Sequence, residues 1–211
     1  MKIIHLSDTH IGLGSNADKF NLVIEQLIDS PPAAPDNCLV LHTGDLIDSA
    51  SEQHRNTAQA LLARLRHAGY RVLLCPGNHD YGDLMEINNA AAGAFTRQFA
   101  SYLFEQQAQT FPVLHLLGDD YACIGLDSSA AELSFWQRWL AEGHLGADQL
   151  DRLNLLLDSD AVRGRRVILY LHHHPFYYGY SVMPDVGDSH PLHHLLVWLS
   201  RPFRRMKDAY S

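Results

Sequence analysis

The feature that most constrains the fold of this chain is a set of four apolar runs, each followed at once by a short polar segment. The runs span residues 3–6, 38–41, 72–75 and 167–171, and the polar segments are Asp8-Thr9-His10, Gly44-Asp45, Gly77-Asn78-His79-Asp80 and His172-His173-His174-Pro175. Such runs are typical of parallel strands that are buried on both faces. Ligands of open α/β sheets gather at the carboxyl ends of the strands. We therefore expect four strands to deliver these polar side chains to one edge of a sheet.

The segments between the runs predict helices, so that strands and helices alternate as in an α/β fold. Apolar residues recur at helical spacing over residues 17–28, and a second helix is expected over residues 52–68, ending at Gly69. The remaining expected elements are a helix over residues 88–108, an antiparallel hairpin over residues 112–126, and helices over residues 136–142, 147–157 and 192–199.

Length and composition exclude several classes of protein. The 211 residues are enough for one domain, so we expect residues 1–211 to form a single domain. The net charge of −8 argues against binding of long nucleic acid, which requires a basic face. Cys38, Cys75 and Cys123 show no CxxC spacing and are expected to be buried, reduced thiols. No apolar run approaches the ~18–20 residues of a membrane span, so we expect a cytoplasmic protein without membrane contact.

The residue types in the polar segments suit phosphate-ester hydrolysis. This reaction needs a strong nucleophile and a sink for the charge on the phosphoryl oxygens, and two divalent ions about 3.5–4 Å apart supply both. Such a centre takes oxygen and imidazole ligands from several rigid strands. The segment Gly77-Asn78-His79-Asp80 is the most specific of the four. Its glycine permits an unusual backbone angle, its asparagine offers a carbonyl oxygen, and its histidine is a candidate acid.

Taken together and in this order, the four segments resemble the DxH, GD, GNH[DE] and strand-following histidine motifs of the calcineurin-like metallophosphoesterase superfamily. The resemblance covers residues 1 to about 178. It implies an αββα sandwich of mixed sheets flanked by helices. Residues 125–128 and 149–157 are also similar to the class that contains cyclic-nucleotide phosphodiesterases.

The resemblance also implies a metal centre of two divalent ions, which would be Mn, Fe or Zn. By this likeness Asp8 and His10 would bind the first ion and Asp45 would bridge both ions. Asn78 would bind the second ion together with one histidine of the triple. His173 is the favoured histidine because His173-His174-Pro175 matches the His-x-Pro pattern of the family, and His172 is the alternative.

Two further roles follow from the resemblance. His79 would contact the phosphate and protonate the leaving oxygen. Asp48, three residues after Asp45, would orient His79, although a role as the first residue of a helix is equally open.

The chain departs from the family pattern at one motif, because no GHxH occurs in it. In the family this motif supplies one histidine to each ion. The only Gly-His pair, Gly143-His144, precedes the triple-histidine strand and lacks the second histidine. We therefore expect the domain to be truncated at its C-terminus and the sandwich to be incomplete there. As an alternative, His190, His193 or His194 would substitute for the missing ligands.

The expected function is hydrolysis of phosphodiester or phosphomonoester bonds through this dinuclear centre. The expected substrate is a small phosphate ester such as a nucleotide. The alternative is a catalytically impaired metallophosphoesterase-like domain that acts as a binding or scaffold protein. A histidine-rich metal store is a third reading, and the ordered placement of Asp8, Asp45 and Asn78 after strands argues against it. The sequence does not indicate an oligomeric state.

Overall fold

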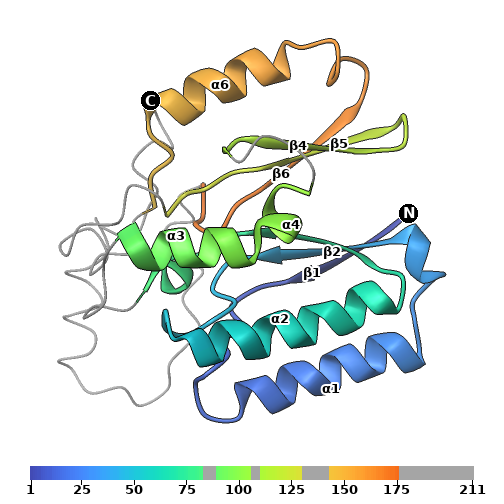
Figure 1. Cartoon of the computed structure of the whole chain (residues 1–211). Helices are drawn as coiled ribbons and strands as arrows, with labels where there is room; N and C mark the ends of the chain where they lie inside the picture. The colour runs from blue at the N-terminus through green and yellow to red at the C-terminus, as the bar shows by residue number, and fades with distance from the viewer. Residues whose placement is uncertain (83–88, 106–109, 130–142, 176–211) are drawn as a thin grey trace, which may run out of the picture.

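The computed structural model of the chain describes residues 1–82, 89–105, 110–129 and 143–175. Its helices and strands form layers in the order helices, sheet, sheet, helix (Figure 1). Helices α1 (Asn16–Asp29) and α2 (Glu52–His67) cover the outer face of the first sheet, and α6 (Ala147–Leu157) covers the outer face of the second. The αββα sandwich expected from the sequence is therefore confirmed for the described residues.

The first sheet consists of three parallel strands in the order β1 (Lys2–Leu6), β2 (Cys38–Thr43) and β3 (Arg71–Cys75). Every residue of the central strand β2 is buried. Val40 packs with the core under the helices, whereas Leu41 packs against the second sheet. Both faces of the strand are thus apolar, which explains why its sequence reads as a continuous run.

The helices of this half form where apolar periodicity predicts them. Helix α1 buries Phe20 and Ile24, and α2 buries Leu62 and Leu65, all against the first sheet. The hydroxyl of Ser51 caps α2 by accepting a hydrogen bond from a backbone amide of its first turn. The short helix η1 (Pro35–Asn37) leads into β2.

The second sheet is mixed. Strands β4 (Val113–Leu117) and β5 (Tyr121–Gly125) form the expected antiparallel hairpin, and β6 (Arg166–Tyr170) pairs parallel to β5. The turn of the hairpin begins at Gly118, whose φ of 60° lies in the left-handed region that favours glycine.

One sheet edge does not carry all four polar segments, so that prediction was wrong. Strand β6 belongs to the second sheet, where it pairs with β5. Tyr170 of β6 packs face to face with Leu41 and Leu73 of the first sheet instead of pairing with them along an edge. Apolar periodicity identifies a buried strand but does not encode its pairing partner.

The region between β3 and β4 differs from the single helix expected over residues 88–108. The described residues there form α3 (Asn89–Gln98) and a short helix α4 (Ala100–Leu103), separated at Phe99. Phe95 and Phe99 are fully buried, with ring centroids 4.7 Å apart. The helices expected over residues 136–142 and 192–199 lie outside the described residues.

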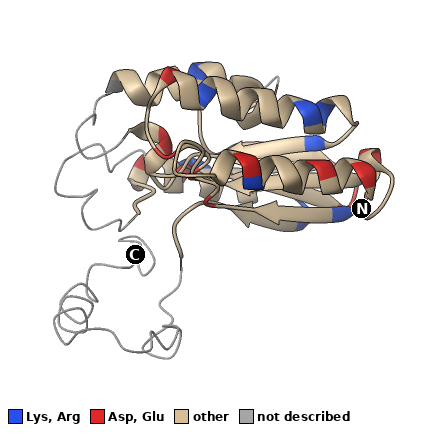
Figure 2. Cartoon of the chain, turned by 90° about the horizontal axis from the view of Figure 1, so that it is seen from below, with Lys and Arg blue, Asp and Glu red and all other residues tan. Residues whose placement is uncertain are grey.

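The described residues also bear on the compositional predictions. Cys38, Cys75 and Cys123 are buried and free, as expected. No described helix combines the length and the apolar character needed to cross a membrane. Acidic positions predominate on α1 and basic positions on α2 (Figure 2).

Glu105 supports a prediction about acid stability. It accepts two hydrogen bonds from Arg71, at 2.9 and 2.7 Å, and lies 3.0 Å from Nδ1 of the buried His115. The contacts with His115 and then Arg71 lower the pKa of Glu105 to about 2 from 4.5. Because the folded-state pKa is the lower one, its stability contribution is complete above pH 4.5 and is lost as the pH falls through about 2.

We expect Glu105→Gln to lower the free energy of unfolding at pH 7 by ~1–2 kcal/mol, since hydrogen bonds to charged groups contribute about 1.5–3 kcal/mol and partial exposure weakens them. Urea denaturation of both proteins at several pH values measures the difference. It should shrink between pH 4.5 and about 2. A difference that stays constant over this interval would contradict the assigned role of the carboxylate.

Candidate metal centre

The loops after β1 and β2 pair with each other beyond the ends of their strands. The backbone amide of Asp8 donates to the carbonyl of Gly44 at 3.1 Å, and that of His10 donates to the carbonyl of Asp45 at 3.0 Å. These bonds hold Asp8 and His10 at a set position relative to Asp45.

The backbone of these loops is strained. Asp8, His10 and Asp45 have φ angles of 53°, 41° and 53°, and they account for three of the four non-glycine residues with positive φ in the described part of the chain. Such conformations cost about 1–3 kcal/mol each and cluster at functional sites, where the surrounding structure enforces them. All three residues were predicted from the sequence as metal ligands.

The loop after β3 approaches Asp45 so closely that only glycine fits. A Cβ atom on Gly77 would lie 2.3 Å from both the backbone nitrogen and the Oδ1 atom of Asp45. This approach lets the backbone amide of His79 donate to Oδ1 of Asp45 at 2.9 Å. The two loops therefore present Asp45, Asn78 and His79 to the same site.

His172 joins this site from the end of β6. Its Nδ1 atom lies 2.9 Å from the carbonyl oxygen of Thr43, which can only accept, so Nδ1 carries the proton. Its Nε2 atom consequently faces Oδ1 of Asn78 at 3.2 Å and Oδ2 of Asp45 at 3.4 Å. One ligand atom each of Asp8, Asp45 and His172 lies within 4.8 Å of the others.

Charge couples Asp45 and His172. Burial disfavours the charged form of each, but their hydrogen bond and mutual attraction outweigh it. The pKa of His172 is therefore raised and that of Asp45 is lowered. The Asp45 carboxylate, which is 4% exposed, is thus held in its charged form. A divalent cation would meet the same electrostatic demand.

His173, the histidine favoured as a ligand from the sequence, is not part of this cluster, and its ring packs edge-on against that of His172 with ring centroids 4.9 Å apart. The Nδ1 atom of His173 lies 2.8 Å from the hydroxyl of Ser128. Side chains alternate along a strand, and His172 continues the face of Tyr170, which is turned to the first sheet. His173 continues the face of Leu171, which packs on the opposite side of the second sheet. The structure therefore brings the alternative, His172, to the cluster.

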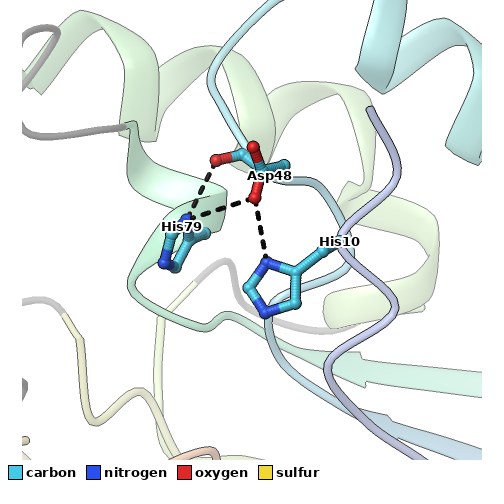
Figure 3. A group of neighbouring side chains, drawn as sticks. All are labelled: His10, Asp48 and His79. Carbon is cyan, nitrogen blue, oxygen red and sulfur yellow. Dashed lines mark hydrogen bonds and ion pairs between the residues drawn. The ribbon is translucent and has the colours of Figure 1, made fainter. Parts of the chain in front are cut away.

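Asp48, His10 and His79 form a neighbouring group, in which Asp48 contacts both imidazole rings (Figure 3). Nδ1 of His79 lies 2.9 Å from the backbone carbonyl oxygen of Asp48 and 3.9 Å from its Oδ1 atom. The same Oδ1 atom lies 3.3 Å from Nδ1 of His10. Asp48 thus contacts His79 as expected, more closely through its backbone than its carboxylate, and its contact with His10 was not foreseen.

The sequence reasoning assigned no role to two buried polar residues that support the loops. His42 is 0% exposed, and burial above all lowers its pKa to about 3. Its Nε2 atom lies 3.0 Å from the hydroxyl of Thr9, in the loop that carries Asp8 and His10. Asp80, also 0% exposed, contacts two loop backbones. The sequence feature that could have indicated a role for His42 is its position as a histidine at the end of an otherwise apolar run.

The structure brings some of the predicted ligands together, whereas others lie outside the described residues. Asp8, His10, Asp45 and Asn78 are brought together, and Nε2 of His10 lies 3.6 Å from Oδ2 of Asp45. This set of carboxylate, amide and imidazole donors suits Mn, Fe or Zn and selects none of them. The residues proposed to replace GHxH, His190, His193 and His194, lie outside the described residues.

The centre opens onto a groove of about 600 Å³ between the edges of the two sheets. Asp8 and His172 line this groove together with the apolar side chains of Ile3 and Leu169. The two ligands are therefore accessible from outside the sandwich.

The chain is similar to known proteins in sequence and in fold. The sequence model of the calcineurin-like phosphoesterase family matches residues 1–200. No curated protein matches the chain. Among solved structures, a dimetal phosphatase from Danio rerio has the same fold, with a TM-score of 0.54 and 13% identity over 82% of this chain and 70% of that chain. The likeness to the class containing cyclic-nucleotide phosphodiesterases stays a prediction. Because the family match spans nearly the whole sequence, the chain belongs to the calcineurin-like phosphoesterase family.

Proposed function

We propose that this chain hydrolyses small phosphate esters through a centre of two divalent metal ions. The observation that carries the proposal is the convergence of Asp8, Asp45, Asn78 and His172, which come from the ends of strands in both sheets. The description of the structurally similar zebrafish protein as a dimetal phosphatase supports the number of ions.

The ligand atoms suggest how the ions would be held. Asp8 and His10 are proposed for the first ion, Asn78 and His172 for the second, and Asp45 for both. Thr43 fixes the tautomer of His172 that leaves Nε2 available as a ligand. When bound, two divalent ions acidify a water molecule and neutralise charge on the phosphoryl oxygens.

His79 is proposed as the acid for the leaving oxygen. Its Nδ1 atom donates to the carbonyl of Asp48, so Nε2 is the atom that would deliver a proton to the substrate. The side chain is 36% exposed, so a substrate can reach it. Asp48 would keep the ring in this orientation.

The substrate is proposed to be a small phosphodiester or phosphomonoester, with nucleotides as the first compounds to test. The net charge of −8 argues against long nucleic acid as the substrate, because binding it requires a basic face.

The test combines metal counting with catalysis. The chain is loaded with Mn, freed of unbound ion, and assayed for metal by elemental analysis and for hydrolysis of bis(p-nitrophenyl) phosphate and p-nitrophenyl phosphate. About two ions per chain together with turnover are expected. Bound ions without turnover would favour the alternative, a binding or scaffold domain. A chain that binds no ion would overturn the dinuclear centre.

The histidine at the end of β6 can be assigned by a matched pair of variants. We expect His172→Gln to weaken Mn binding by at least ~10- to 100-fold, because even residues that only orient a ligand have effects of this size. His173→Gln should lower Mn affinity much less, since Nδ1 of His173 lies beside the hydroxyl of Ser128 and its ring reaches the cluster only through the ring of His172. Titration calorimetry measures both variants. A larger loss for His173→Gln would restore His173 as the ligand.

A further inference from the structure

The carboxylate of Asp80 is buried beside the metal centre without facing it. Asp80 is 0% exposed. Its Oδ1 atom accepts a hydrogen bond from the backbone amide of Ile47 at 3.1 Å, and Oδ2 accepts one from the amide of Gly77 at 2.8 Å. Ile47 lies in the loop after β2, and Gly77 begins the loop after β3. One carboxylate thus connects two loops.

A second hydrogen bond joins the same two loops, with the donor and acceptor loops exchanged. Asp45, on the loop after β2, accepts from the backbone amide of His79 on the loop after β3. Asp80, on the loop after β3, accepts from the amide of Ile47 on the loop after β2. The two loops are therefore joined reciprocally at the point where they carry Asp45 and Asn78.

The turn that carries Asp80 is also held from the second sheet. The short helix η2 (His79–Tyr81) places His79 at the surface of the site and Asp80 in the interior. The hydroxyl of Tyr81 donates to Oδ2 of Asp127, just after β5, at 2.6 Å. The turn is therefore hydrogen-bonded both to the loop after β2 and to the end of β5. A substitution of Asp80 removes the first of these contacts and so changes the spacing of the two loops.

We propose that Asp80 is a positioning residue of the metal centre, which sets the distance between Asp45 and Asn78 by joining the loops that carry them. This inference rests on the proposed function, in which those two residues bind metal. Metal and catalytic sites tolerate only about 0.5 Å of displacement in their ligands. Loosening the loops should therefore weaken metal binding more than it weakens the fold.

The test is Asp80→Asn in the full chain, with Mn binding measured by calorimetry and folding by circular dichroism. Asparagine has the same shape, but its NH₂ group would face one of the two backbone amides in place of an acceptor. We expect Mn affinity to fall by ~10- to 100-fold, as for other residues that orient metal ligands. Asp80→Glu keeps a carboxylate that can accept from both amides, and it should retain more Mn affinity than Asp80→Asn.

Glu105→Gln is the matched control, since it also changes a carboxylate with hydrogen-bonded partners into an amide. Its partners Arg71 and His115 lie on β3 and β4 and contact none of the proposed ligands. It should lose stability without losing Mn affinity. Unchanged affinity in Asp80→Asn, equal losses in Asp80→Asn and Glu105→Gln, or failure of both Asp80 variants to fold would overturn the positioning role. Absence of Mn binding by the unaltered chain would instead overturn the proposed function and this inference with it.

Discussion

Replacing Asp45 by asparagine is expected to abolish binding of both metal ions and to lower phosphoesterase activity by at least about 10³-fold. Bound metal supplies several kcal/mol of transition-state stabilisation, and about 1.4 kcal/mol corresponds to a factor of ten in rate. The Asp45 carboxylate contacts two other proposed ligands. Its Oδ2 atom lies 3.4 Å from Nε2 of His172 and 3.6 Å from Nε2 of His10. Asparagine keeps its shape and one acceptor for the amide of His79, so the backbone should hold.

Elemental analysis of Mn-loaded protein and the rate of ester hydrolysis measure this effect. Asp36→Asn is the matched control, because it makes the same chemical change at an exposed residue. Asp36 lies in η1, which precedes β2. It should keep both ions and full activity. Retention of two ions by Asp45→Asn would show that the bridging role is wrong.

Replacing His79 by glutamine is expected to lower activity by about 10²–10⁴-fold while the metal content stays unchanged, since general acids typically contribute rate factors of this size. The loss should depend on the leaving group. An alkyl phosphate ester needs a proton on its departing oxygen, whereas p-nitrophenolate leaves without one. We therefore expect a large loss for the alkyl ester and a much smaller loss for the p-nitrophenyl ester.

The kinetic constants for the two esters and the Mn content of His79→Gln are measured side by side. His67→Gln, an exposed histidine at the end of α2, is the control and should behave as the unaltered chain. If Mn content fell together with activity, His79 would be a ligand instead of an acid. The group His10, Asp48 and His79 would then be the metal-binding one.

Local sequence patterns predicted most of the scaffold. Strands β1, β2, β3 and β6 and helices α1, α2 and α6 lie within a few residues of their expected ranges. These elements depend on apolar periodicity and on turn residues, which are short-range properties of the chain. The order of the four polar segments was likewise enough to indicate the family, and the family match confirms it.

The choice between His172 and His173 could not be made from the motif pattern, which favoured His173. It depends on which face of β6 is turned to the first sheet, and Tyr170 shows that face only once the two sheets are packed. The assignment of β6 to the second sheet has the same origin, because strand pairing is a long-range contact that periodicity does not encode.

The sequence by itself determined the strands, the residue types at their ends and their order, and from these the family and the chemistry to expect. The tertiary structure decided which side chains meet. It turned His172 and not His173 toward Asp45, placed Asp48 in contact with His10 and His79, and buried Asp80 where it joins two loops. The physical reason is that a local pattern sets the conformation of a segment, whereas distances between ligands depend on how loops from two sheets pack together.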